Sequence, residues 1–187
     1  MRKQSSIAQI AIFFAIMLVL HLLSSVIFNL LPVPIKPTII HIPVIIASII
    51  YGPRIGAVLG ALMGVISVVT NTVVLLPTSY LFSPFVENGS INSLMIAMVP
   101  RILIGITPYF VYKWMKTKPG LVLAGAVGSM TNTIFVLGGI FILFSSVYNG
   151  DIKAMLALIF SANAISEMII SAILTVAIVP ALEKLKK

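Results

Sequence analysis

Arg101 is a residue of this chain whose chemistry needs an explanation. It follows Pro100 inside the apolar run AMVPRILIG, residues 97–105. A charged side chain inside a lipid-buried helix is costly and is, by default, a functional one. Its guanidinium presents a fork of N–H donors that suits a carboxylate. Because Pro100 has no backbone N–H, the kink it causes should free the carbonyl of Ile96 for another donor.

Few other ionisable side chains fall inside the apolar segments. Of the four acids, Glu87 and Asp151 lie in predicted outer loops and Glu183 lies in the tail, which leaves Glu167. At about 1.5 Å rise per residue, Arg101 lies about 14 Å below the outer boundary and Glu167 about 22 Å below it. Polar side chains expected within the outer half or the middle of the membrane are His41, Asn71, Asn132 and Asn163.

Two interpretations of these buried groups stay open. In the first, Arg101 pairs with Glu167 and the amides join neighbouring helices. In the second, the groups line a pocket that opens outward, where Arg101 binds the carboxylate of a small solute. Both hold if Glu167 orients Arg101 until the ligand arrives. The predicted substrate-binding residues are Lys36, His41, Asn71, Tyr80, Arg101, Asn132, Asn163 and Glu167.

Two outer loops suit the mouth of such a pocket. The first contains LPVPIKPT, whose three prolines favour a stiff, extended segment, and it carries Lys36. The second contains LPTSYLFSPF, in which Tyr80, Phe82 and Phe85 could close over a ligand. Aromatic residues at this depth are equally typical of membrane-interface anchors, so both interpretations stay open.

The composition places these residues in an integral membrane protein. The chain has 187 residues, of which 60% are hydrophobic and 9% charged, and its mean hydropathy is +1.19. Soluble domains carry about 25% charged residues. The net charge of +8 does not indicate nucleic-acid binding, because the basic residues lie at the ends of apolar segments, where membrane topology and anionic headgroups explain them.

Proline, glycine and charged residues divide the chain into six apolar segments, at 7–31, 38–51, 54–76, 92–115, 120–147 and 152–182. Five reach the ~20 residues that cross a bilayer. The second is shorter and is expected to line a cavity or to lie against other helices. We therefore predict an all-α integral membrane protein, with residues 1–187 forming a single six-helix domain.

The basic residues predict the orientation of this domain. With a cytoplasmic amino terminus, nine of the 12 Lys and Arg residues lie inside, Lys36 and Lys153 lie outside, and Arg101 lies within the membrane. Cytoplasmic loops carry an excess of Lys and Arg. Both termini are therefore predicted to be cytoplasmic.

Small residues recur at helical spacing in two segments. In lipid, such stripes let helix backbones approach closely. The stripe in the third segment, which predicts packing within the bundle, consists of Gly52, Gly56, Gly60 and Gly64. The stripe in the first segment fits either internal packing or docking of another protein's helix, and consists of Ala8, Ala11 and Ala15.

Several catalytic classes lack their motifs. The chain has no cysteine, which excludes disulfides and thiolate chemistry. It has no phosphate-binding Gly-x-x-x-x-Gly-Lys-[Ser/Thr] run, no His-Glu-x-x-His, no Gly-x-Ser-x-Gly, and no acid cluster for Mg²⁺. We expect neither an enzyme nor a bound metal or cofactor. A self-sufficient carrier that moves protons through Glu167 or His41 remains an alternative, as does a purely structural subunit.

The order of the motifs resembles a known family. The sequence AIFFA, a proline-rich first outer loop, HIPVIIASIIYGP running into GAVLGALMG, and then VPRILIG are similar to the substrate-binding S components of energy-coupling factor (ECF) vitamin transporters. This resemblance covers nearly the whole chain. It implies a multi-pass protein of the bacterial plasma membrane that binds a vitamin-like solute from outside. It also implies partners: a transmembrane coupling protein and two ATPases.

The resemblance also implies roles for particular residues. In this family an Ala-x-x-x-Ala motif docks the coupling protein, a role that falls on Ala11 and Ala15 with Ala8 beside them. PTIIHIPVII followed by PTSYLFSPF is most similar to the pantothenate-type branch. Pantothenate offers one carboxylate to Arg101, and hydroxyls and an amide to Asn and His side chains. Other carboxylate vitamins, such as folate, remain alternatives.

Overall fold

The protein is a bundle of membrane-length helices. The computed structural model describes residues 5–30, 38–145 and 150–186. In these ranges the elements are α1 (Ser6–Leu30), α2 (His41–Tyr51), α3 (Pro53–Val73), the 3-10 turn η1 (Ser79–Leu81), α4 (Ile91–Ile104), α5 (Thr107–Trp114), α6 (Lys118–Leu143) and α7 (Gly150–Lys186). Five candidate spans, formed by α1, α3, α4 with α5, α6, and α7, are long and apolar enough to cross a membrane. The all-α prediction is confirmed.

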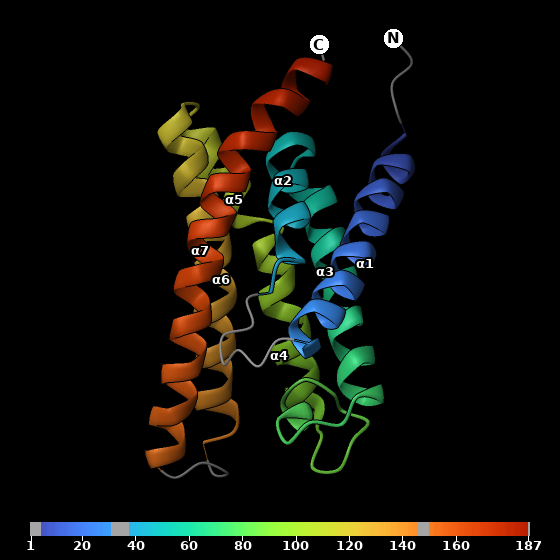
Figure 1. The fold of residues 1–187 in the computed structure, drawn as a ribbon, viewed down its shortest axis with the longest axis vertical. Helices are drawn as coiled ribbons and strands as arrows, with labels where there is room; N and C mark the ends of the chain where they lie inside the picture. Colours follow the sequence, from blue (N-terminus) through green and yellow to red (C-terminus); the bar gives the residue numbers. More distant parts are fainter. Residues whose placement is uncertain (1–4, 31–37, 146–149, 187) are drawn as a thin grey trace.

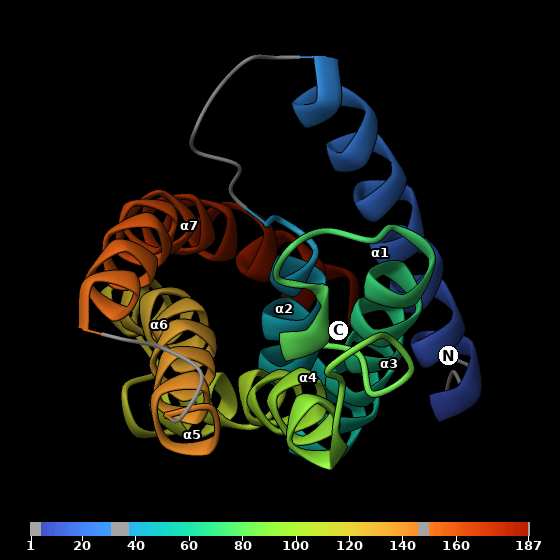
Figure 2. The same cartoon turned by 90° about the horizontal axis from the view of Figure 1, so that it is seen from below.

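The short helix α2 lies at the centre of the bundle, with α7, α3, α4 and α1 around it (Figure 2). Its residues from His41 to Ile50 are buried. A helix that is apolar on every side is stable when it is enclosed, which explains how a run rich in Ile and Val forms a helix here. The prediction that the second segment lies against other helices is confirmed.

A tight turn joins α2 to α3. Gly52 ends α2 with φ +99°, a conformation that side chains with a Cβ rarely adopt, and its N–H bonds to the carbonyl of Ser48. Pro53 then opens α3, where a missing N–H costs nothing. A Cβ on Gly52 would meet nothing within 4 Å. Gly52 therefore belongs to the turn and not to the predicted packing stripe.

The other glycines of that stripe bring α3 against α4. A Cβ on Gly56 would collide with the carbonyl of Gly105, and one on Gly60 would collide with the carbonyl of Arg101. At Gly64 a Cβ would lie 2.6 Å from the Met98 sulfur. The predicted internal packing is confirmed for these three glycines.

The fourth apolar segment is broken, which corrects the expected continuous helix over 92–115. It forms α4 up to Ile104 and α5 from Thr107. Pro108 has no N–H to give to the carbonyl of Ile104, and its ring crowds that carbonyl, so the helix is interrupted one turn earlier. Pro100, in contrast, lies inside α4 without ending it.

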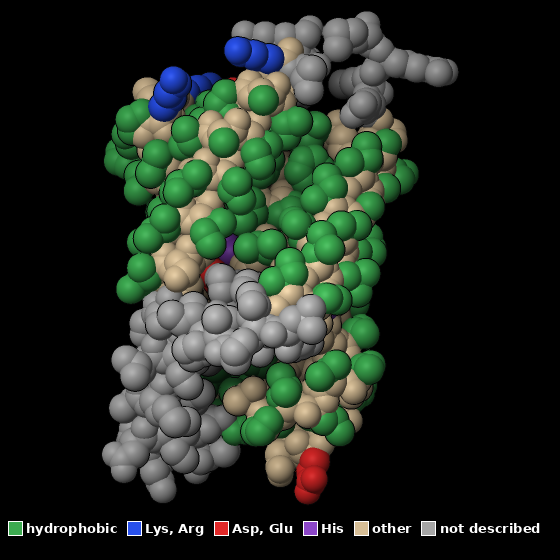
Figure 3. Space-filling view, in the orientation of Figure 1, with side chains coloured by type: hydrophobic (Ala, Val, Ile, Leu, Met, Phe, Trp, Pro, Cys, Tyr) green, Lys and Arg blue, Asp and Glu red, His purple; other side chains and the backbone are tan. Residues whose placement is uncertain are grey.

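Basic and acidic side chains lie at opposite ends of the long axis of the bundle. The first helix begins and the last ends at the same end of the bundle (Figure 1). On the face shown in Figure 3, Lys and Arg side chains gather at this end and an acidic side chain lies at the opposite one. Described basic residues at helix ends or in the turn there are Arg54, Lys113, Lys116, Lys118 and Lys184. This arrangement fits the predicted topology, although the side of the membrane stays a prediction.

Candidate ligand-binding site

Arg101 lies in the interior of the bundle, 9% exposed. Its Nη1 donates a hydrogen bond of 2.7 Å to the carbonyl of Ile96, the acceptor that Pro100 leaves free one helical turn later. The sequence predicted this free carbonyl. Its Nε is buried without a hydrogen-bond partner. A buried donor that lacks a partner is rare, so the guanidinium has capacity for a further acceptor.

Two neighbours fix the position of this guanidinium. The ring of Phe82, just after η1, lies under it with 5.3 Å between Cζ and the ring centroid, which suits a cation–π contact. On the backbone side, Gly60 of α3 packs directly against the carbonyl of Arg101. The head of the side chain is therefore held by an aromatic ring, and its backbone is held by the glycine stripe.

Glu167 of α7 is 6% exposed and binds a backbone group. Its Oε1 accepts a hydrogen bond of 2.6 Å from the N–H of Thr38. No ion pair within 4.0 Å joins the described side chains of Glu167 and Arg101. The direct Arg101–Glu167 pair of the first interpretation is therefore absent from the structure.

His41 is fully enclosed at the beginning of α2, 1% exposed. Its Nε2 lies 2.8 Å from the Oγ of Ser171, one helical turn beyond Glu167 on α7. Its Nδ1 is buried next to the backbone of Thr38 and makes no well-formed hydrogen bond. Two consecutive turns of α7 therefore hold residues 38–41.

The register of the helices gives the relative depths of the predicted amides. Gly139 of α6 packs on Ile96 of α4, and Gly125 of α6 packs on Ser171 of α7. Because α6 runs antiparallel to both, Asn163 comes level with Arg101, and Asn132 comes level with Ala164. Glu167 lies about one turn nearer the end where α1 begins and α7 ends. The order of Arg101 and Glu167 agrees with the depths expected from the sequence.

Asn132 has spare hydrogen-bonding capacity. It is half-buried, and its Oδ1 is buried without a hydrogen-bond partner. Asn163 is also half-buried and already takes part in an interaction. A buried amide oxygen without a donor suits a ligand that brings a hydroxyl or an N–H.

Two further predicted site residues have described contacts with other groups. Asn71 donates from Nδ2 to the carbonyl of Ser67 in its own helix, and no described contact joins it to Arg101 or Glu167. The Tyr80 ring packs edge-on against Phe144, at 5.9 Å between centroids. Lys36 lies outside the described residues.

Sequence reasoning missed two partners. Ser171 follows Glu167 by four residues, which places both on one face of a helix, so a search at this spacing could have found it. Thr38 contributes its backbone N–H, which carries no sequence signal.

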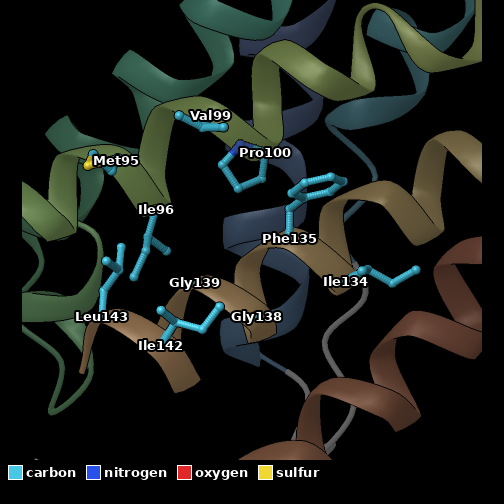
Figure 4. A pocket seen from close by; sticks show the side chains of 10 residues that line it. All are labelled: Met95, Ile96, Val99, Pro100, Ile134, Phe135, Gly138, Gly139, Ile142 and Leu143. Carbon is cyan, nitrogen blue, oxygen red and sulfur yellow. The ribbon is translucent and has the colours of Figure 1, made fainter. Parts of the chain in front are cut away.

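Arg101 lines neither of two cavities in the described part of the chain. One, of about 430 Å³, is an apolar crevice between α4 and α6 (Figure 4). Its lining has no charged side chain and consists of Met95, Ile96, Val99, Pro100, Ile134, Phe135, Gly138, Gly139, Ile142 and Leu143. Met95, Ile134 and Ile142 are exposed, so this crevice faces the lipid and does not suit a polar ligand. The other, of about 580 Å³, lies under residues 72–88 and includes Tyr80.

The predicted docking stripe lies on an open face of α1. This helix packs onto the core through Phe13 and Met17. On its outward side Ala8, Ala11 and Ala15 are all exposed. The stripe is therefore not used for packing within the described part of the chain.

Comparison with known proteins agrees with this architecture. Residues 5–179 match the family described as the substrate-specific component of ECF transporters. The chain is 49% identical over 187 residues, 97% of its length and 95% of the relative's, to the pantothenic acid transporter PanT of Lactococcus lactis subsp. cremoris. It is 31% identical over 162 residues, 76% of its length and 73% of the relative's, to the pantothenate transporter PanT of Leuconostoc mesenteroides. Family members are transport components and not enzymes, as the sequence predicted. The chain belongs to the substrate-specific S components of ECF transporters.

Proposed function

We propose that this protein captures pantothenate from outside a bacterial plasma membrane and that Arg101 binds the pantothenate carboxylate. The buried guanidinium of Arg101, with its unpartnered Nε, carries the proposal. Its Nη1 is already fixed by the Ile96 carbonyl and its face by Phe82, so a carboxylate can bind it with little further ordering. The two pantothenate transporters, similar over most of this chain, support the choice of vitamin.

The rest of pantothenate also finds suitable chemistry nearby. The Oδ1 of Asn132, at a level between Arg101 and Glu167, can accept from a hydroxyl or from the amide N–H of the ligand. The dimethyl group of pantothenate requires an apolar wall, and Phe82 beside Arg101 supplies one. The chain thus offers a cation, an amide acceptor and an aromatic surface to a solute with a carboxylate, polar groups and an apolar branch.

The partners of this component follow from the family. The ligand leaves on the cytoplasmic side with energy from a transmembrane coupling protein and two ATPases. The exposed stripe of Ala8, Ala11 and Ala15 on α1 supports a docking role, because a flat, small-residue face lets a foreign helix approach closely. The end of the bundle that holds both termini and the basic residues is cytoplasmic in this proposal.

A binding panel tests the proposed ligand. Purified protein is titrated calorimetrically with pantothenate, folate, lipoate, biotin, niacin, riboflavin and thiamine. We expect pantothenate to bind with a Kd below about 1 μM and the uncharged or cationic vitamins not to bind. Tight binding of another carboxylate vitamin would keep the role of Arg101 and replace the substrate. If only riboflavin or thiamine bound tightly, both the carboxylate-binding role of Arg101 and pantothenate as the substrate would be wrong.

A further inference from the structure

The start of α2 is fastened to α7 at two successive turns. The N–H of Thr38 donates 2.6 Å to Glu167, and Nε2 of His41 lies 2.8 Å from the Oγ of Ser171. Glu167 and Ser171 are four residues apart, so they present both groups on one face of α7. Between the two bonds lies Ile40, the residue that precedes the first turn of α2 and is 5% exposed.

We propose that Glu167 and Ser171 form an anchor, called here the α7 anchor, that holds residues 38–41 in place for binding. In this proposal Glu167 is a positioning residue that contacts the backbone of Thr38 and not the ligand. The inference rests on the proposed function for its effect on affinity, but the anchor itself is a property of the empty protein.

Three observations favour this role for Glu167. Its Oε1 already accepts a short, charge-assisted hydrogen bond from the N–H of Thr38. A carboxylate that faced an anionic ligand would repel it. Glu167 is instead hydrogen-bonded to Thr38, so it is not expected to contact the ligand. The neighbouring turn of α7 repeats the pattern, since Ser171 meets His41 in the fully buried layer below.

The anchor acts on binding through preorganisation. Residues 38–41 lead into α2, which is enclosed by α3, α4, α6 and α7 at the centre of the fold (Figure 2). Without the anchor, this entry to α2 must be ordered when the ligand binds, and the cost appears as lower affinity and faster dissociation. Arg101 and its bond to Ile96 would remain unchanged.

Substitutions at Glu167 separate the anchor from the charge. Glu167→Ala removes the acceptor, and we expect roughly 10- to 100-fold weaker pantothenate binding, mostly from faster dissociation. Glu167→Gln keeps an amide oxygen that Thr38 can bond, so it should recover most of that loss. If Gln binds as weakly as Ala, the charge of Glu167 toward Arg101 is what matters, and the anchor proposal is wrong.

A second, ligand-independent measurement tests the anchor directly. Because the chain has no cysteine, Ile40→Cys introduces one thiol at the buried position between the two bonds. A charged alkylating reagent should modify this thiol several-fold faster in the Glu167→Ala background than in the wild-type or Gln backgrounds. Phe85→Cys, at an exposed position, is the reference and should react equally in all of them. Equal rates at Ile40→Cys would overturn the anchor.

Ser171→Ala supplies an independent route should Glu167→Ala fail to fold. It removes the partner of His41 and should also accelerate alkylation of Ile40→Cys. Ser129→Ala is the matched control, because Ser129 is a buried serine whose Oγ has no described hydrogen-bond partner. If Ser171→Ala behaves as Ser129→Ala does, the proposal fails. If wild-type protein binds no pantothenate, the proposed function fails while the alkylation experiment still decides the anchor.

Discussion

Arg101 and Glu167 both lie inside the bundle, and each is hydrogen-bonded to a backbone group instead of to the other. Arg101 donates to the carbonyl of Ile96, and Glu167 accepts from the N–H of Thr38. A direct buried ion pair would consume the donors of the guanidinium. With its partner engaged elsewhere, the guanidinium keeps donors for a ligand carboxylate.

Removal of the guanidinium should abolish recognition of the carboxylate. We expect Arg101→Ala to weaken pantothenate binding by about 3 kcal/mol or more, roughly 100-fold, while the protein stays a folded monomer. The alcohol analogue of pantothenate, which lacks the carboxylate, sharpens the measurement. Wild-type protein should bind pantothenate much more tightly than the alcohol, and Arg101→Ala should bind the two with similar affinity. Unchanged affinity for the acid in calorimetry would return Arg101 to a structural role.

The glycine behind Arg101 should be sensitive to a single methyl group. A Cβ on Gly60 would overlap the Arg101 carbonyl, so Gly60→Ala must push α4 away from α3. Overpacking of this kind costs about 1–3 kcal/mol, and we expect a lower Tm together with weaker binding. Gly138→Ala is the matched control, since a Cβ there meets nothing within 4 Å. Equal Tm values for the two variants would contradict the packing argument.

Asn132 should show opposite effects on stability and on binding. Its buried Oδ1 has no donor in the described structure, so Asn132→Leu removes a polar group that costs free energy in the empty protein. We expect an unchanged or higher Tm and roughly tenfold weaker pantothenate binding, which would mark Asn132 as a ligand contact. Thr175→Val removes another buried unpartnered oxygen, deeper along α7, and should leave affinity unchanged. Wild-type affinity in Asn132→Leu would exclude Asn132 from the site.

The alanine face of α1 should matter for uptake and not for binding. Ala15→Leu adds bulk to a stripe whose alanines are exposed in the described chain. We expect pantothenate affinity in detergent to stay at the wild-type value, while ATP-driven uptake with the partner module is lost because the helices can no longer approach closely. Ala181→Leu makes the same change at an exposed alanine of α7 and serves as the control. If uptake is unchanged in Ala15→Leu, the alanine stripe contacts lipid and does not dock the partner.

The sequence predicted features that depend on single residues and their spacing. Pro100 removes an N–H, and the carbonyl of Ile96 is consequently free and bonded by Arg101. The short second segment is enclosed because it is almost entirely apolar, and its one histidine finds a partner in Ser171. Glycines four apart on α3 pack on α4 because only hydrogen fits between the backbones.

Features that depend on three-dimensional neighbours could not be predicted in this way. The partner of Glu167 is a backbone N–H, which every residue except proline has, so no residue type indicates Thr38. Which face of α1 packs inward is decided by contacts of Phe13 and Met17, not by the helix itself, since the helix is apolar all round. The break before α5 depends on Pro108, whereas Pro100, a proline in the same segment, is accommodated within α4.

Pro100 should set the position of Arg101 through one hydrogen bond. In Pro100→Ala the new N–H can bond to the carbonyl of Ile96, which Arg101 now uses. The helix gains a backbone hydrogen bond, so the Tm should rise, because a proline inside a helix costs about 3 kcal/mol. The guanidinium loses its fixed position, and pantothenate should bind roughly tenfold more weakly.

A double-mutant cycle tests whether this effect passes through Arg101. The loss of affinity caused by Pro100→Ala should vanish when Arg101 is already alanine, because there is then no guanidinium to misplace. Calorimetric Kd values for the two single variants, the double variant and the wild type give the coupling free energy. An equal loss of affinity in both backgrounds would mean that the kink shapes the site through the backbone of α4. A loss confined to the background with Arg101 would make the carbonyl of Ile96 the group that prepares the guanidinium for its ligand.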